Sequence, residues 1–305
     1  MADSPWSWRT RLLFLVQVGC WGLNYPFVVL GLGSAAPLWL AFLRTGTGLI
    51  ASAAVVSVVG GWGALDRRGR RDAALLGLLN ATAFFGLWFW AAGFVTPGIA
   101  AILVYTFPLW VALLSLPVLG VRLGPVQWGS VAVGFAGVVL VSGATGGSTP
   151  IPLVAALALG LAAIAWAVGT VLTRRRFHRD QMLEANVYQL LGGTAGLLLA
   201  VAVLEPVPLP RASPDLLLSV LWLGVLGTAV AYSIWYFLLG RTVAARLSAY
   251  LFLVPVVALA ASAAFFGERL SLVQFGGVAL VLLSIYGVSR GSRELNPSDE
   301  APASV

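Results

Sequence analysis

Ten long apolar segments dominate the chain. A bilayer core of about 30 Å is crossed by roughly 20 residues of α-helix, and each of these segments has 18 to 24 residues. They cover residues 12–30, 37–59, 73–95, 99–119, 125–142, 151–173, 182–204, 216–239, 247–266 and 271–289. Together they hold 213 of the 305 residues but only two charged side chains, Arg44 and Glu184. Because the segments are apolar all round rather than on one face, they predict an all-α polytopic membrane protein with ten transmembrane helices.

The composition excludes the main alternatives. Only 10% of the residues are charged and 60% are hydrophobic, whereas a soluble domain carries about 25% charged residues. A transmembrane β-barrel would show alternating segments of about ten residues instead of these long apolar runs. The single cysteine, Cys20, excludes an internal disulfide.

The arginines predict the orientation of the chain in the membrane. All 18 basic residues are arginine, and cytoplasmic loops of membrane proteins are enriched in basic residues. With the N-terminus in the cytoplasm, fifteen arginines fall in cytoplasmic segments, two (Arg211 and Arg269) fall outside, and Arg44 lies within a span. An even number of spans returns the C-terminus to the cytoplasm. The net charge of +7 therefore follows from topology, and no nucleic-acid partner is expected.

The chain also repeats itself at an offset of 147 residues. The matches include Gly77, Trp88, Pro108, Gly120, Arg122 and Gln127 with Gly224, Trp235, Pro255, Gly267, Arg269 and Gln274. We therefore predict a first repeat over residues 10–143, a second over 150–290, and a polar tail over 291–305. Because each repeat holds five helices, an odd number, the second enters the membrane from the opposite side. Inverted repeats of this kind are typical of secondary transporters.

Several short motifs occur together in this pattern. They are Trp21-Gly22-Leu23-Asn24, Pro37, Arg44, Tyr232 with Trp235, Pro255, Gly267-Glu268-Arg269-Leu270 and Gln274-Phe275-Gly276. On these residues the sequence resembles the drug/metabolite transporter superfamily, in particular its ten-helix members with two EamA domains. The resemblance spans roughly residues 10–290. The first half departs from the pattern at Gly120-Val121-Arg122-Leu123, which lacks the glutamate, and Val29 stands where many members carry lysine.

The resemblance implies a permease of the bacterial inner membrane, usually an exporter of amino acids, other metabolites or drug-like compounds, and the arginine distribution places both termini in the cytoplasm. Its cavity would be formed by helices 1–4 and 6–9. We therefore predict a secondary transporter that moves a small organic solute by alternating access, in the direction of export. An importer of the same architecture and a non-transporting scaffold or sensor are the alternatives.

An enzyme is not predicted. His178 lies among arginines in a loop, and Cys20 has no neighbouring ligand residue with the spacing of a metal site. No metal or other cofactor is therefore expected. The expected partners are a small-molecule substrate and the lipid bilayer, and a homodimer is left open.

Arg44 is the most informative side chain. A basic residue deep in a membrane helix costs roughly 2.5–3.5 kcal/mol on insertion scales, so it usually faces a cavity or a partner. It is either a fixed cation for a substrate carboxylate or an arginine that braces the helices, and the sequence does not separate these interpretations. Glu184 and Glu268 lie at span ends next to Arg179 and Arg269, so we interpret them as structural charges.

Other polar and aromatic side chains within the spans are candidates for the substrate-binding site. A buried amide needs a partner helix, a water or a ligand, and aromatic rings can line a cavity for aromatic, zwitterionic or cationic solutes. The predicted set, beside Arg44, is Trp21, Asn24, Asn80, Trp88, Tyr105, Trp166, Gln189, Tyr232, Trp235 and Tyr250.

Two prolines at equivalent places, Pro108 and Pro255, are the predicted gating residues. A proline inside a helix removes one backbone hydrogen bond, and paired interruptions in corresponding spans often lie beside the moving site. We therefore predict that the fourth and ninth spans bend at these prolines.

Overall fold

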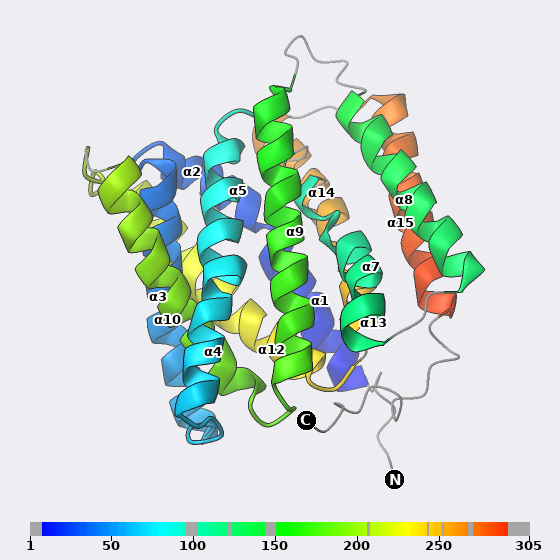
Figure 1. Ribbon diagram of the computed structural model, residues 1–305. Coiled ribbons are helices and arrows are strands. Elements are labelled where there is room, and N and C mark those ends of the chain that lie inside the picture. The colour runs from blue at the N-terminus through cyan, green and yellow to red at the C-terminus, as the bar shows by residue number, and fades with distance from the viewer. Residues whose placement is uncertain are drawn as a thin grey trace.

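The chain is described by a computed structural model over residues 8–95, 100, 103–120, 124–143, 151–205, 208–242, 244–251, 253–267 and 271–291. Its regular elements in these ranges are all helices, which confirms the predicted all-α class (Figure 1). They are α1 (Trp8–Gly22), α2 (Asn24–Leu32), α3 (Pro37–Val59), α4 (Arg67–Gly77), η1 (Leu78–Ala83), α5 (Phe84–Ala92), α7 (Phe107–Leu119), α8 (Pro125–Gly143), α9 (Leu153–Arg176), α10 (Met182–Leu204), α11 (Pro214–Leu221), η2 (Trp222–Val230), α12 (Ala231–Leu239), α13 (Ala244–Tyr250), α14 (Leu253–Phe266) and α15 (Leu272–Gly291). The two η elements are π-helical.

Six helices in the described ranges are long and apolar enough to cross a membrane. They run over Trp8–Leu32, Pro37–Val59, Arg67–Ala92, Leu153–Arg176, Met182–Leu204 and Pro214–Leu239. The chain is therefore a membrane protein with several apolar helices. The finer prediction of ten spans in two inverted repeats stays a prediction.

Two of these long helices change their hydrogen-bond register near the middle. In an α-helix each backbone N–H bonds to the carbonyl four residues earlier. At the end of η2 the N–H of Ala231 instead donates to the carbonyl of Leu226, five residues earlier, and leaves the carbonyl of Gly227 without this bond. At the end of η1 the N–H of Phe84 likewise donates to the carbonyl of Leu79, five residues earlier, and not to that of Asn80. π-Helical segments inserted into α-helices are frequent at functional sites.

The fourth and ninth apolar segments are interrupted just before their central prolines. Pro108 is the second residue of α7, after a turn at Tyr105 and Thr106, and Pro255 is the third residue of α14. The first-turn N–H groups of a helix have no helical partner, so a proline there removes no helical hydrogen bond. Our expectation that each proline breaks a bond inside a continuous span was wrong. The gating role itself stays a prediction.

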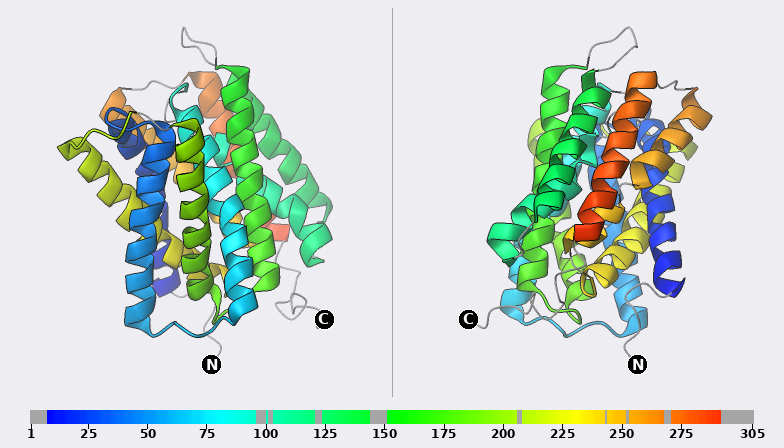
Figure 2. Two further views of the ribbon diagram at one scale, coloured as in Figure 1. Left: turned by 60° about the vertical axis from the view of Figure 1, so that its left-hand side comes forward. Right: turned by 90° about the vertical axis from the view of Figure 1, so that its right-hand side faces the viewer.

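Helices α8 and α15 pack closely as a pair at one side of the bundle (Figures 1 and 2). Small residues form the contact between them. A Cβ atom on Gly137 would collide with the carbonyl of Gly277, and one on Gly287 would collide with the hydroxyl of Ser130. Close backbone approach through small residues is a common way for membrane helices to associate.

Helix α10 approaches α4 and η1 equally closely. A Cβ atom on Gly77 would collide with the carbonyl of Gln189, and one on Gly192 would collide with that of Ala74. Gly193 lies against the side chain of Ala81. These glycines hold η1 against α10 and so position the polar side chains that both helices carry.

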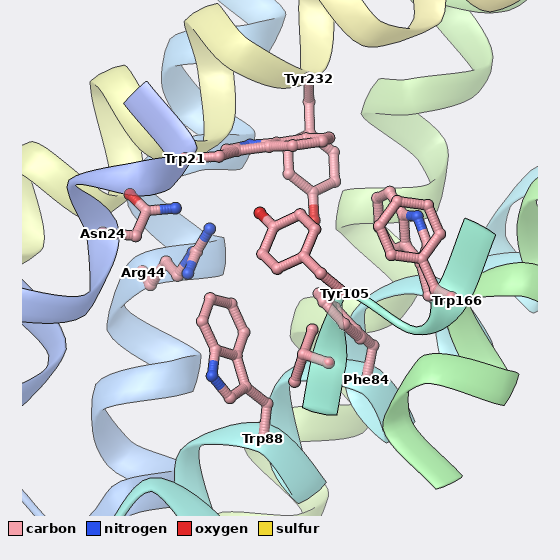
Figure 3. Close-up of a pocket in the computed structure, with 10 residues that line it drawn as sticks. Trp21, Asn24, Arg44, Phe84, Trp88, Tyr105, Trp166 and Tyr232 are labelled. Atoms are coloured by element: carbon pink, nitrogen blue, oxygen red, sulfur yellow. The ribbon is translucent and has the colours of Figure 1, made fainter. Parts of the chain in front are cut away.

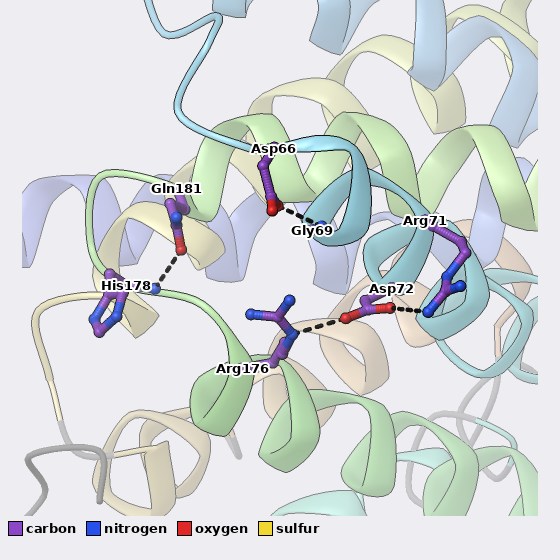
Figure 4. Close-up of polar contacts among 7 residues, drawn as sticks. All are labelled: Asp66, Gly69, Arg71, Asp72, Arg176, His178 and Gln181. Carbon is purple, nitrogen blue, oxygen red and sulfur yellow. Dashed lines mark hydrogen bonds and ion pairs between the residues drawn. The ribbon is translucent and has the colours of Figure 1, made fainter. Parts of the chain in front are cut away.

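The predicted cytoplasmic end is held together by short polar contacts (Figure 4). The carboxylate of Asp66 accepts a hydrogen bond of 2.7 Å from the backbone N–H of Gly69 and so caps α4. Asp72 pairs with Arg176 at 2.8 Å and thereby links α4 to α9. The backbone N–H of His178 donates to the side chain of Gln181, which places His178 in a structural turn.

Glu184 is buried in this same end of the bundle. We expected Arg179 to offset its charge, but its Oε1 lies 3.4 Å from Nε of Arg70. Its Oε2 accepts a hydrogen bond of 2.9 Å from the backbone N–H of Leu65. Glu184 thus ties α10 to the start of α4, in keeping with a structural charge. Glu268 and Arg269 lie outside the described residues.

Candidate functional site

A cavity lined by aromatic and polar side chains lies inside the bundle (Figure 3). Its lining comes from helices α1, α2, α3, α5, α7, α9 and α12 and from the segment before α7. The lining residues are Trp21, Asn24, Arg44, Phe84, Trp88, Val104, Tyr105, Phe107, Trp166 and Tyr232. Seven of the eleven side chains predicted for the substrate site are among them.

Arg44 supplies the positive charge of this cavity and is only 1% exposed. Its Nε donates to the hydroxyl of Thr228 at 3.1 Å, and its Nη2 donates to the carbonyl of Gly227 at 3.2 Å. The guanidinium carbon lies 4.2 Å from the ring centre of Phe85 and 5.3 Å from that of Trp88. Its Nη1 is buried and finds no acceptor among the described residues. The guanidinium is therefore fixed in place with one donor unused.

The π-helical turn in η2 explains how Arg44 is held. Because the N–H of Ala231 passes over Gly227, the Gly227 carbonyl is accessible to side chains from other helices. It accepts a hydrogen bond of 3.1 Å from Nε1 of Trp21 as well as the bond from Arg44. Gly227 itself has no side chain, and a Cβ atom there would collide with the amide of Asn24. This carbonyl thus orients two residues of the cavity.

Aromatic rings form most of the cavity wall. Trp21, Trp166 and Tyr232 meet edge to face, with ring centres 5.2 to 6.1 Å apart. Such edge-to-face packing stabilises aromatic pairs beyond the area that they bury. Nε1 of Trp166 is buried and has no hydrogen-bond acceptor among the described residues. The hydroxyls of Tyr105 and Tyr232 point into the cavity beside Arg44 (Figure 3).

Two predicted site residues, Asn80 and Gln189, lie outside the cavity lining and bond to each other. Oε1 of Gln189 also accepts a hydrogen bond of 2.8 Å from the hydroxyl of Tyr236, and its Nε2 donates to Thr173 at 3.2 Å. This polar cluster of Asn80, Thr173, Gln189 and Tyr236 joins η1, α9, α10 and α12. It ties the helices together next to the cavity, and a contact with solute stays a prediction for both residues.

Trp235 packs behind the cavity wall. It is fully buried, and its ring centre lies 5.9 Å from that of Trp21 and 6.3 Å from that of Trp166. The side chain of Tyr250 lies outside the described part of the structure, as does that of Pro255.

Comparisons with known proteins identify the family. The model of the EamA-like transporter family matches the chain twice, over residues 8–143 and 153–290. The chain belongs to the EamA-like transporter family. The resemblance inferred from the sequence is therefore confirmed, and the protein is a membrane transporter of the drug/metabolite transporter superfamily.

Several relatives match this EamA transporter over nearly its whole length. A "Probable amino-acid metabolite efflux pump" of Escherichia coli (strain K12) is 30% identical, with 92% of this chain and 94% of the relative covered. The "Uncharacterized transporter YvbV" of Bacillus subtilis is 28% identical, with 93% of each chain covered. The "Uncharacterized inner membrane transporter YedA" of Escherichia coli (strain K12) is 27% identical, with 89% of this chain and 87% of the relative covered.

A solved structure described as "Crystal structure of protein" shares the fold of this EamA transporter. Its TM-score is 0.71 at 22% sequence identity, and the match covers 94% of this chain and 99% of the solved chain. The family and its named relatives are transporters rather than enzymes. The described residues also contain no group of three or more His, Cys, Asp or Glu side chains that could hold a metal ion.

Sequence reasoning missed three residues that line the transporter's cavity, Phe84, Val104 and Phe107. Phe84 lies one helical turn before Trp88 and so shares its face of the helix, which is a signal that the sequence carries. Val104 and Phe107 resemble any other apolar residue of a span, so nothing in the sequence distinguishes them. The partners of Arg44 in η2 were missed because hydrogen-bond register leaves no residue pattern.

Proposed function

We propose that this transporter exports a small organic solute with a carboxylate group across the inner membrane by alternating access, and that Arg44 binds the carboxylate. The observation that carries the proposal is the guanidinium of Arg44, which lines a buried cavity with Nη1 unused. An arginine forms strong, charge-assisted hydrogen bonds with carboxylates.

The energetics of burial support this role. Removing an arginine from water without an opposite charge is unfavourable, and the described residues offer Arg44 no ion pair. Its contacts to Thr228 and Gly227 brace η2 against α3, but a neutral side chain could serve as a brace without that penalty. A bound carboxylate would offset the charge, so a binding role explains why an arginine stands there.

Interruptions near the cavity support a moving site. The fourth and ninth segments break next to Pro108 and Pro255, and discontinuous helices often surround the site of secondary transporters. Export is favoured over import because one full-length relative is named an efflux pump. Sided vesicles distinguish the directions, since export predicts uptake into inside-out vesicles and import predicts uptake into right-side-out ones.

The test uses purified full-length protein in proteoliposomes. Counterflow of labelled amino acids and other monocarboxylates is measured for the parent, for Arg44→Gln and for Arg68→Gln, a control at an exposed arginine in α4. We expect counterflow of at least one carboxylate solute by the parent and the control, and a loss of about tenfold or more in Arg44→Gln. Normal flux of that solute in Arg44→Gln would show that Arg44 is only a brace.

A further inference from the structure

The distribution of acidic side chains restricts what the cavity can bind. All acidic residues that the structure describes lie at or near the ends of helices, and none lines the cavity. They are Asp66, Asp72, Asp180, Glu184, Glu205 and Asp215. A positively charged group on a solute would therefore meet the charge of Arg44 without a carboxylate to balance it. A single negative charge on the solute would make the occupied cavity neutral.

The unused polar atoms of the cavity are mainly hydrogen-bond donors. Nη1 of Arg44 and Nε1 of Trp166 are buried without acceptors among the described residues. The hydroxyls of Tyr105 and Tyr232 point toward the same space (Figure 3) and can also donate. The amide oxygen of Asn24 is an unused acceptor among the described lining residues, but it lies against Gly227 in η2 and on the side of the amide away from Arg44 (Figure 3). The cavity can therefore satisfy an oxyanion better than an ammonium group.

The wall of the cavity indicates the shape of the rest of the solute. Rings from Trp21, Phe84, Trp88, Phe107 and Trp166 surround the space, and aromatic rings prefer to meet other rings edge to face or offset-stacked. The wall therefore favours a solute with an aromatic ring, which can meet these rings in either geometry.

We propose that the solute is an aromatic monocarboxylate without a cationic group, such as an arylalkanoate or an aryl 2-oxo acid. This inference rests on the proposed function and narrows it, because it excludes zwitterionic amino acids as the preferred solutes. The carboxylate binds Nη1 of Arg44, the ring stacks within the aromatic wall, and Nε1 of Trp166 donates to an oxygen of the solute. The α-ammonium group of an amino acid would lose its water without gaining a carboxylate partner. Unpaired polar groups are what a site rejects most strongly.

The test compares solutes that differ by one group. Isothermal titration calorimetry on the purified full-length protein measures binding of 3-phenylpropanoate, phenylalanine, 2-phenylethylamine and 3-cyclohexylpropanoate. The first two differ by the ammonium group, phenylalanine and 2-phenylethylamine differ by the carboxylate, and 3-cyclohexylpropanoate lacks the aromatic ring. We expect 3-phenylpropanoate to bind about tenfold or more tightly than phenylalanine, about threefold more tightly than 3-cyclohexylpropanoate, and 2-phenylethylamine not to bind.

Two variants link the selectivity to the named atoms. Arg44→Gln should lower the affinity for 3-phenylpropanoate by about tenfold or more. Trp166→Phe keeps a ring but removes the Nε1 donor, and it should lower that affinity by about fivefold. Trp62→Phe, at a half-exposed tryptophan outside the cavity, is the control and should leave the affinity unchanged.

The outcomes separate this inference from the proposed function. Tighter binding of phenylalanine than of 3-phenylpropanoate, with loss of both in Arg44→Gln, would overturn the inference and leave the carboxylate site standing. Tight binding of 2-phenylethylamine, or binding of the carboxylates that is insensitive to both variants, would overturn the inference and the proposed role of Arg44 together.

Discussion

Two contacts, each between a residue of the first half of the chain and a residue of the second half, use the same pair of residue types with their positions exchanged. The amide of Asn24 in α2 lies against Gly227 in η2, and the amide of Asn80 in η1 lies against Gly169 in α9. Asn24 and Gly169 are 145 residues apart, and Asn80 and Gly227 are 147 apart. In each contact, a glycine of the second half has no side chain and thus allows an asparagine of the first half to approach closely.

The halves differ in the side chain that faces each π-helical segment. Arg44 in α3 bonds to η2, whereas Gln189, 145 residues later in α10, bonds to Asn80 in η1. The neutral amide of Gln189 finds acceptors and donors among its neighbours, including Tyr236. The cation of Arg44 keeps an unused donor. The same position is therefore a structural joint in one half and, in our proposal, a binding site in the other, and the charge of Arg44 makes the difference.

The largest expected effect comes from removing the charge. Arg44→Met should reduce carboxylate transport by about 100-fold, since a hydrogen bond to a charged group contributes about 1.5–3 kcal/mol. It should not destabilise the fold, because the Gly227 carbonyl keeps the bond from Trp21 and the Thr228 hydroxyl keeps its own to Leu223. Thermal unfolding of the purified protein is the measurement. A clear fall in Tm would mean that Arg44 is mainly a brace, and the contrast between the halves would fail.

Gln189→Leu should have the opposite result. It leaves Asn80, Tyr236 and Thr173 without their common hydrogen-bond partner. Each buried polar group that is left unpaired costs about 1–3 kcal/mol. We expect a loss of stability of about 2–3 kcal/mol, measured by denaturant unfolding. If stability is unchanged while transport is lost, Gln189 contacts the solute and the two halves function alike.

A smaller effect is expected from Thr228→Val, which keeps the shape of the side chain and removes the acceptor for Nε of Arg44. Solute affinity should fall by about fivefold, since a typical hydrogen bond contributes about 1 kcal/mol. The matched control is Thr82→Val in η1, where the hydroxyl donates to the carbonyl of Gly193 at 2.9 Å. Thr82→Val should lower the unfolding free energy by a similar amount as Thr228→Val without changing solute affinity. If both variants lower solute affinity equally, η2 has no special role in binding compared with η1.

The smallest effect should come from the ion pair at the predicted cytoplasmic end. Asp72→Asn removes the negative charge that pairs with Arg176 (Figure 4), and exposed ion pairs contribute about 1 kcal/mol or less. We expect a change in unfolding free energy below about 1 kcal/mol that disappears in high salt. A larger change would show that this end of the bundle, rather than the cavity, governs stability.

Hydropathy and charge were sufficient to predict helices and to expect that Arg44 faces a cavity, since a lone cation within an apolar segment is visible in any sequence. The sequence pattern was not sufficient to distinguish the residues that line the cavity from those of the polar cluster of Asn80, Thr173, Gln189 and Tyr236. Asn24 and Gln189 have the same kind of side chain, and only the packing of neighbouring helices decides that one lines the cavity and the other bonds to Asn80. The interruption before Pro108 was misassigned by a few residues, because a proline suits the first turn of a helix as well as a kink.

The π-helical segment η2 also sets the rotational phase of the residues that follow it. An α-helix turns by about 100° per residue, and a π-helical turn takes up additional residues, so each added residue rotates α12 about its axis by that angle. Tyr232, which lines the cavity, is the second residue after η2, so the direction of its side chain depends on this rotation. Deleting one residue within Trp222–Val230 would leave the hydropathy of the helix almost unchanged but would turn a different side chain toward the solute. Relatives with the same hydropathy profile can therefore present different walls to their solutes through a change of one residue in length.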